Sequence, residues 1–229
     1  AMGPRLFDYL LYEKEPETGI LWIKFNRPER MNALVGTAEE NGTVAKVGEY
    51  MRAADDDPDV RVIVLTGVGR AFCAGNDAKG PKEDEDFGEF LPGNRSPREG
   101  NPDGERQSFF HGYTKIIREI SLIRKPTIAM VNGWCFGGAF TPMIACDLAV
   151  AAESAVFGLS EINWGIIPAG IVTKAVAEAI GQRDALYYIM TGETFDGAQA
   201  ARMRLVNEAV PAAQLADVAQ QHHGPGGHL

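Results

Sequence analysis

Two glycines near the middle of the chain stand in a context suited to backbone donors for an oxyanion. Gly137 and Gly138 lie in the run from Gly133 to Thr141, which is mostly apolar and small. Because glycine has no side chain, backbone N–H groups there approach a ligand closely, and the first turn of a helix leaves such donors without acceptors. We therefore expect donors for a developing negative charge, although the same glycines would also serve a tight turn alone.

A single carboxylate follows this run. Glu161 lies twenty residues after Thr141, and its neighbours Leu159, Ile162 and Trp164 are apolar. An apolar environment disfavours the charged form of a carboxyl group, so it raises the pKa and suits the group to proton transfer near neutral pH. Oxyanion donors together with one acid–base group predict an enzyme. The alternative for Glu161 is an exposed or ion-paired surface glutamate.

The surrounding residues alternate between strand and helix patterns. Runs rich in β-formers and bounded by turn residues predict strands, and apolar residues at helical intervals predict helices. The predicted strands are 19–25, 60–66, 127–131 and 148–151, and the predicted helices are 37–55, 109–123 and one that begins at 137. Strands alternating with helices indicate an α/β fold with a parallel sheet flanked by helices. The candidate donors lie where glycine-rich loops follow buried strands.

Length and composition predict one core domain over residues 1–221. With 229 residues and 45% hydrophobic content, the chain has enough apolar material for a sizeable core. Residues 80–107 are rich in Pro, Gly and charge and directly follow the candidate site segment Phe72–Asp77, which favours a mobile lid over an inert surface insertion. Residues 222–229 predict a disordered tail, and their three histidines favour a frayed end over a metal site.

Charge and cysteine content exclude several functional classes. A net charge of -9 and a pI near 5.0 argue against a nucleic-acid partner, which needs a basic surface. No segment reaches the roughly 18 apolar residues of a membrane span, and no apolar leader is present, so we expect a cytoplasmic protein without a membrane partner. Cys73, Cys135 and Cys146 lack ligand spacing and predict reduced, buried thiols rather than metal ligands or nucleophiles.

Five segments resemble, in order, the consecutive signatures of the crotonase (enoyl-CoA hydratase/isomerase) superfamily. The likeness extends from about Trp22 to Pro211. The segments are Asn26–Leu34, Phe72–Asp77, Ala129–Gly133 with the following Gly137–Gly138 turn, Cys146–Ala149 and Phe157–Glu161. Within the superfamily, Trp134–Gly138 and Leu159–Gly165 are most similar to the hydroxycinnamoyl-CoA hydratase-lyases, which hydrate feruloyl- or coumaroyl-CoA and cleave the product by retro-aldol chemistry.

The resemblance implies a crotonase-like spiral of ββα units, assembled as a homotrimer or as a hexamer of two trimers. It also implies an acyl-CoA thioester as the partner, so that coenzyme A is part of the substrate and no metal or separate cofactor is needed. By motif position, the backbone N–H groups of Asn76 and Gly138, beside Gly137, would hold the thioester oxygen. Backbone donors do not depend on the side chain, so Asn76 need not use its amide.

Four further positions correspond to substrate-binding places in the superfamily. Arg30 takes the place of a basic residue near the CoA phosphates, with a solvated arginine as the alternative. The backbones of Ala74 and Ala78 take the places that meet the adenine end. Trp164 corresponds to a tryptophan that lines the acyl pocket in the hydratase-lyases, with a core tryptophan as the alternative.

The chain departs from the family pattern at several positions. Ordinary hydratases carry two glutamates twenty positions apart, whereas here the pair is Thr141 and Glu161. Threonine orients a water but is no base near neutral pH, so Glu161 must move the protons, as in isomerases and hydratase-lyases. The tyrosine that grips the phenolic hydroxyl in the hydratase-lyases is replaced by Pro81. The C-terminal helical region that carries a second tyrosine is also missing from the sequence.

These features predict a CoA-thioester lyase, an enoyl-CoA hydratase of the hydroxycinnamoyl-CoA hydratase-lyase type with a role in phenylpropanoid degradation. The oxyanion donors and Glu161 would hydrate an enoyl-CoA, with retro-aldol cleavage depending on the acyl group. One alternative is an enoyl-CoA isomerase that uses Glu161 alone. The other alternative belongs to a different class of function: a catalytically weak homologue that binds acyl-CoA.

Overall fold

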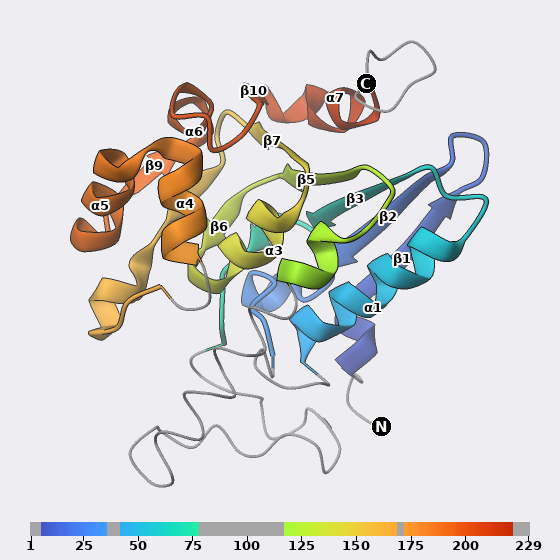
Figure 1. Cartoon of the computed structure of the whole chain (residues 1–229), viewed down its shortest axis with the longest axis horizontal. Helices are drawn as coiled ribbons and strands as arrows, with labels where there is room; N and C mark the ends of the chain where they lie inside the picture. Colours follow the sequence, from blue (N-terminus) through green and yellow to red (C-terminus); the bar gives the residue numbers. More distant parts are fainter. Residues whose placement is uncertain (1–5, 36–41, 78–116, 169–171, 222–229) are drawn as a thin grey trace, which may run out of the picture.

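The structure is a computed structural model that describes residues 6–35, 42–77, 117–168 and 172–221. Among these residues, one sheet has six strands and a second sheet has four strands (Figure 1). In order across the larger sheet, the strands are β1 (Leu10–Glu15), β2 (Ile20–Phe25), β3 (Val62–Gly67), β5 (Thr127–Val131), β7 (Leu148–Ala152) and β10 (Glu208–Val210). The second sheet contains β4 (Ala71–Cys73), β6 (Trp134–Phe136), β8 (Val156–Gly158) and β9 (Thr194–Asp196).

The larger sheet is parallel except at one edge. β2, β3, β5, β7 and β10 run parallel to their neighbours, whereas β1 pairs antiparallel with β2. Every residue of β3 and β5 is buried, as expected for parallel strands covered on both faces. The four strands that the sequence predicts in this sheet are confirmed to within two residues at their ends. β1 was not predicted, because its polar residues Glu13, Lys14 and Glu15 mask the strand pattern.

Helices surround the sheets. The described α-helices are α1 (Thr43–Asp56), α3 (Phe140–Ala145), α4 (Val172–Ile180), α5 (Gln182–Thr191), α6 (Gly197–Arg202) and α7 (Leu215–Gln221), and residues 117–121 are also helical. Short 3-10 turns occur at η1 (Leu6–Tyr9), η2 (Pro28–Arg30), η4 (Gly137–Ala139), η5 (Ser160–Trp164) and η6 (Ala212–Gln214). α1 packs on β1 and β2, and α7 packs on β5 and β7. One apolar cluster connects both sheets with these helices.

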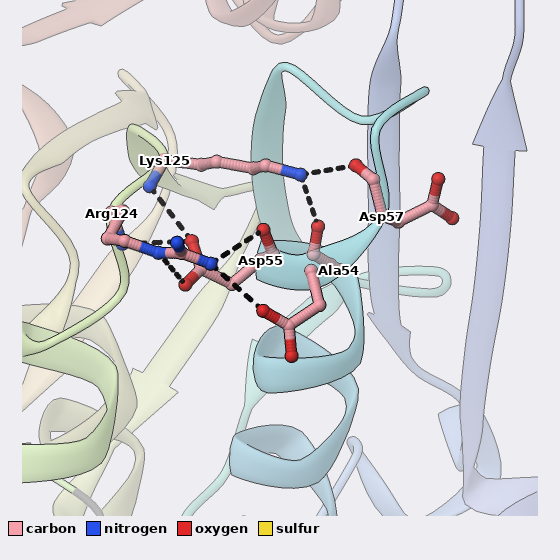
Figure 2. Close-up of polar contacts among 6 residues, drawn as sticks. Ala54, Asp55, Asp57, Arg124 and Lys125 are labelled. Carbon is pink, nitrogen blue, oxygen red and sulfur yellow. Dashed lines mark hydrogen bonds and ion pairs between the residues drawn. The ribbon is translucent and has the colours of Figure 1, made fainter.

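A charged cluster fixes the end of α1 to the segment before β5 (Figure 2). The Arg124 guanidinium donates to the carboxylates of Asp55 and Asp56 at 2.8 and 2.9 Å. The Lys125 ammonium donates to the carbonyl of Ala54 at 2.6 Å. Cations at the last turn of a helix satisfy carbonyls that have no intrahelical donor. The cluster is therefore explained as a cap for the C-terminal end of α1.

The strands alternate between the two sheets along the chain. β3 is followed by β4, β5 by β6, and β7 by β8, so that each long strand of the larger sheet leads into a short strand of the second. A helical turn then follows β6 and β8. This is the repeated ββα arrangement that the sequence resemblance predicts. Its consequence is that three separate loops leave the same small sheet.

Several predictions fall on parts of the chain outside the described residues. They concern the segment 80–107, the tail 222–229 and the position Ala78, and these stay predictions. None of the described helices is both long enough and apolar enough to cross a membrane. Within the described ranges, no group of three or more His, Cys, Asp or Glu side chains is arranged to hold a metal ion.

Candidate active site

The register of the second sheet brings two glycine-containing loops to one edge. β4 and β6 are parallel neighbours, and Cys73 pairs with Cys135 across them. Asn76 and Gly138 each come three residues after these paired cysteines. Because the carboxyl ends of parallel strands meet at the same edge, the loops that carry these two residues lie side by side.

The two loops are in backbone contact at Gly75. This residue has a φ of +82°, and a Cβ added to it would lie 2.5 Å from the carbonyl oxygen of Phe136 and 3.1 Å from the nitrogen of Gly138. Only glycine adopts such a conformation readily while allowing so close an approach. The Gly138 amide nitrogen is therefore held next to Gly75, the residue before Asn76.

Glu161 reaches the same edge from the next strand. β8 is the parallel neighbour of β6, and Cys135 pairs with Phe157, four residues before Glu161. Gly137 has a φ of +51°, and a Cβ there would lie 3.3 Å from Oε1 of Glu161. The carboxylate thus lies against the backbone of the residue before Gly138. The loops after β4, β6 and β8 bring two candidate amides and one carboxylate together.

Burial sets the proton affinity of Glu161. Removal from water raises the pKa of its carboxyl group, and a hydrogen bond from its own backbone amide offsets part of this increase. Oε2 is buried and has no hydrogen-bond partner among the described residues. A carboxyl with a raised pKa and an oxygen open to a new partner is suited to exchanging a proton with a ligand or water. Glu161 is partly buried and has no ion-pair partner among the described residues, which argues against the alternative of an exposed or ion-paired surface glutamate.

Thr141 is the second side chain with an unsatisfied oxygen. It lies in α3, four residues after Gly137, and is completely buried. Its Oγ1 has no hydrogen-bond partner within the described ranges. Buried polar atoms are nearly always paired in folded proteins, so Thr141 Oγ1 and Glu161 Oε2 are suited to bind a ligand or a water.

The segment before the site contacts the first loop. Ala74 donates its backbone N–H to the carbonyl of Met31 at 2.9 Å. Arg30 lies beside this loop, with Nη1 at 4.0 Å from Oδ1 of Asp77 and a side chain that is 19% exposed. The alternative of a freely solvated Arg30 is therefore wrong. The structure places Arg30 near Asp77, and its contact with CoA phosphates stays a prediction.

Trp164 is not a core residue, which was the alternative considered from the sequence. Its side chain is 70% exposed, and that of Ile162 is 42% exposed. η5 lies at the surface, because its three consecutive residues 162–164 are all exposed. Of the apolar neighbours expected to bury Glu161, only Leu159 is fully buried. The backbone of Gly137 also covers the Glu161 carboxylate. Counting the apolar residues next to Glu161 in the sequence does not reveal this contact.

Next to the glycines, the structure pairs Trp134 with Phe136, a contact that the sequence analysis did not predict. Trp134 and Phe136 stack with their ring centroids 5.1 Å apart, and a Cβ on Gly158 would lie 2.5 Å from the ring of Phe136. The sequence signal for this pair is the spacing of two residues within a strand, because residues i and i+2 lie on the same face. The aromatic pair therefore lies along β6, directly before Gly137.

The predicted burial of the cysteines is confirmed for Cys73 and Cys135, whereas Cys146 is only partly buried. All three are free, and Cys73 and Cys135 are fully buried. Burial raises the pKa of the Cys73 and Cys146 thiols to about 12 and that of Cys135 well above its usual value. Thiols that stay protonated are poor nucleophiles, and Cys73 and Cys135 pack within β4 and β6, the strands that lead into the site.

Comparisons with known proteins match this architecture. The model of the enoyl-CoA hydratase/isomerase family matches residues 15–223. The hydroxycinnamoyl-CoA hydratase-lyase of Pseudomonas fluorescens is 46% identical over 204 residues, which are 89% of this chain and 68% of that protein. The (E)-benzylidenesuccinyl-CoA hydratase of Thauera aromatica is 32% identical over 91% of this chain and 73% of its own length. The crystal structure of an enoyl-CoA hydratase subunit I from Geobacillus kaustophilus superposes with a TM-score of 0.77 at 28% identity, covering 98% of this chain and 76% of that one.

Proposed function

This chain belongs to the enoyl-CoA hydratase/isomerase family, and we propose that it is a lyase that adds water to the double bond of an enoyl-CoA thioester. The observation that carries the proposal is the meeting of three loops at one edge of the second sheet. They bring the amides of Asn76 and Gly138 together with the carboxylate of Glu161. Donors beside a proton-transfer group are the two elements that addition to a conjugated thioester requires.

The two backbone amides bind the thioester oxygen. When water adds to the β-carbon, negative charge moves onto that oxygen and an enolate forms. Donors already fixed at the place where charge develops stabilise the transition state more than the ground state. The close packing of Gly75 against the Gly138 amide supports this role, because it holds the two donors as one rigid unit.

Glu161 transfers the protons. As a carboxylate it takes one proton from the attacking water, while the water oxygen bonds to the β-carbon. As a carboxylic acid it then returns that proton to the α-carbon, so the enolate collapses and the group returns to its starting state. The raised pKa of Glu161 supports this double role, since both forms are accessible closer to neutral pH. Thr141 positions the water through Oγ1, which is buried without a partner among the described residues.

We further propose a hydroxycinnamoyl-CoA as the substrate class. The relative from Pseudomonas fluorescens, a hydroxycinnamoyl-CoA hydratase-lyase, supports this proposal. With such a substrate, the carboxylate of Glu161 removes the proton of the new β-hydroxyl group, and the Cα–Cβ bond breaks. The products are an aromatic aldehyde and the enolate of acetyl-CoA, which takes up the proton. Arg30 and the backbones of Ala74 and Ala78 bind the coenzyme A portion, and Trp164 contacts the acyl group.

The presence of one carboxylate favours a second candidate, an enoyl-CoA isomerase. Ordinary hydratases use two glutamates, and Thr141 takes the position of the first. Glu161 alone is sufficient to move a proton from the α-carbon to the γ-carbon of a 3-enoyl-CoA. Hydration consumes the enoyl absorbance of crotonyl-CoA, whereas isomerisation leaves crotonyl-CoA unchanged and produces a 2-enoyl-CoA from a 3-enoyl-CoA.

Glu161→Gln is the test of this proposal. We expect turnover of crotonyl-CoA or feruloyl-CoA to fall about 10²–10⁴-fold, the usual contribution of a positioned acid–base group, while acyl-CoA binding stays nearly intact. Formation of vanillin and acetyl-CoA from feruloyl-CoA separates cleavage from hydration alone. Wild-type turnover in the folded variant would overturn the assignment of Glu161. Tight acyl-CoA binding without turnover by the wild type would instead identify a binding protein.

The remaining proposals concern assembly and location. We propose a cytoplasmic homotrimer or hexamer that acts in phenylpropanoid degradation, with coenzyme A supplied by the substrate and no other cofactor. Exposed apolar side chains on η5 and α5 support subunit contacts, because large exposed apolar groups commonly mark interfaces. They include Ile162, Trp164, Leu186, Tyr187 and Met190. Light scattering coupled to size-exclusion chromatography measures the subunit number.

A further inference from the structure

The segment Arg27–Leu34 forms a backbone frame for the loop that carries Asn76. The N–H of Leu34 donates to the carbonyl of Gly75 at 2.7 Å, and the carbonyl of Leu34 accepts from the N–H of Asp77 at 2.9 Å. These two bonds form a parallel bridge that grips the residues on both sides of Asn76. The loop is therefore held by residues that lie more than forty positions earlier in the chain.

The bridge fixes the direction of the Asn76 amide. A trans peptide is planar, so its N–H points away from the side on which its C=O lies. The carbonyl of Gly75 belongs to the same peptide as the N–H of Asn76 and is directed toward Leu34. The Asn76 N–H is therefore directed away from the Arg27–Leu34 segment. Any rotation of this peptide would change the direction of the donor.

A buried ion pair holds the residue that follows. Nη1 of Arg27 donates to Oδ2 of Asp77 at 2.6 Å. The exposed fractions of the two side chains are 1% and 8%. Charged groups that lose this much hydration are tolerated only in a well-defined geometry, so the pair restricts the position of Asp77 strongly. Asp77 is covalently joined to Asn76.

Arg27 is itself held in place. Its backbone N–H donates to Oδ1 of Asn32 at 2.8 Å, and its guanidinium lies over the ring of Tyr9 at 5.1 Å from the centroid. The amide of Asn32 donates in turn to the carbonyls of Val68 and Ala71 at 3.0 and 2.7 Å. The carbonyl of Val68 lies in the turn after β3, and that of Ala71 lies in β4. The backbone of Arg27 is therefore anchored through Asn32 to the chain segment that leads into the loop.

We propose that Arg27 is a positioning residue of the oxyanion site, which through its buried ion pair with Asp77 fixes the Asn76 amide in the direction that the thioester oxygen requires. This inference rests on the proposed function, since it takes the Asn76 amide as an oxyanion donor. Arg30 is the weaker partner of Asp77, because its Nη1 is 4.0 Å away and its side chain is more exposed. The pair acts on the reaction through the loop and not by touching the substrate.

The test replaces both members of the Arg27–Asp77 ion pair together. Replacing a buried pair by apolar residues of similar volume usually preserves folding, whereas removing one partner does not. The double variant Arg27→Met/Asp77→Leu is therefore the main test, with Asp77→Asn as a second variant that keeps the side-chain volume and one acceptor. Asp147→Asn is the matched control, because Asp147 also accepts hydrogen bonds, from the N–H and Oγ1 of Thr127, but lies away from the site loops.

Three readouts separate positioning from general stability. We expect kcat to fall about 10²-fold in the double variant, the usual cost of one misdirected donor or of a displacement near 1 Å. Asp77→Asn should lose on the order of tenfold, because the charge-assisted bond becomes a neutral one. KM should stay nearly constant in both. The absorption band of bound 4-dimethylaminocinnamoyl-CoA, which moves to longer wavelength when its thioester carbonyl is polarised, should move less than in the wild type.

The outcomes distinguish this inference from the proposed function. If the wild type turns over crotonyl-CoA and polarises the bound chromophore, and the folded double variant does both equally well, the positioning role is wrong while the proposed function stands. If the double variant does not fold, wild-type kcat in Asp77→Asn likewise overturns the positioning role. If the wild type neither turns over an enoyl-CoA nor polarises the chromophore, the proposed function fails first. Equal losses of kcat in Asp147→Asn would reassign the effect to stability.

Discussion

Replacing Gly75 with alanine tests whether the contact between the two glycine loops sets the rate. A Cβ on Gly75 would lie 2.5 Å from the Phe136 carbonyl oxygen and 3.1 Å from the Gly138 nitrogen. Ordinary contacts begin at 3.4 Å, so the loops must separate by about 0.9 Å along the first of these directions. Both obstacles are backbone atoms, which cannot rotate aside as a flexible side chain would. The change therefore moves the Gly138 amide relative to Asn76.

The expected magnitude has two parts. A non-glycine residue at a φ of +82° destabilises the folded state by about 1–2 kcal/mol. A displacement near 1 Å between groups that act on one reacting atom costs about 10²-fold in rate, or about 2.7 kcal/mol in activation free energy. We expect the second effect to appear in kcat. KM should change less, because the contacts of the coenzyme A portion are not altered.

Gly181→Ala is the matched control. Gly181 has a φ of +86°, close to that of Gly75, but no atom lies within 4 Å of the position that its Cβ would take. It connects α4 to α5 and is part of none of the three site loops. We expect Gly181→Ala to lose stability from backbone strain and to keep the wild-type kcat. The comparison thus separates loop displacement from the cost of a positive φ.

The assay combines steady-state hydration of crotonyl-CoA with thermal unfolding and far-UV circular dichroism. Rates are normalised to the folded fraction of each variant. Wild-type kcat in a folded Gly75→Ala protein would refute the reasoning, because the loop contact would then be irrelevant to the reaction. An equal loss of kcat in Gly181→Ala would also refute it. A crystal structure of Gly75→Ala measures the loop separation directly.

The other predictions concern the proton affinity of Glu161, the residue at position 141 and the buried thiol of Cys73. Burial raises the pKa of Glu161, so the acid limb of the kcat/KM profile should lie above the value of about 4.3 for an ordinary glutamate; a limb at or below that value would contradict a buried general base. A raised folded-state pKa means that this group favours folding below its unfolded pKa and loses that contribution as pH rises through the folded value. The unfolding midpoint of Glu161→Gln relative to wild type should therefore increase over that range, and a constant difference would argue against the shift. Thr141→Glu should increase crotonyl-CoA hydration by restoring paired carboxylates, and no gain with both carboxylates facing the site would mean that another feature limits the rate. The pKa of about 12 for Cys73, which is completely buried, predicts slow labelling of this thiol by a disulfide reagent at pH 8 until the protein unfolds, and rapid labelling in the native protein would contradict its burial.

Local patterns in the sequence were sufficient for much of the fold. The runs at 19–25, 60–66, 127–131 and 148–151 are long and rich in β-formers, and the structure confirms a strand at each. Their alternation with helical patterns predicted a parallel sheet, which holds from β2 to β10. The second sheet was not predicted, because its strands have only three residues. Three residues are too few to show a periodicity of two.

The sequence by itself determined the residue types of the candidate site, and tertiary structure decided their geometry. The glycines, Thr141 and the lone carboxylate Glu161 were recognisable because their chemistry depends on side-chain type and local spacing. The partner of Arg27 was not recognisable, because Asp77 lies fifty positions away and only strand pairing brings the two together. The cover over Glu161 comes from the backbone of Gly137, while Trp164 is exposed. Burial and strand register depend on contacts between segments that are distant in the sequence. Local patterns of residue type do not show these contacts, which form only when the chain folds.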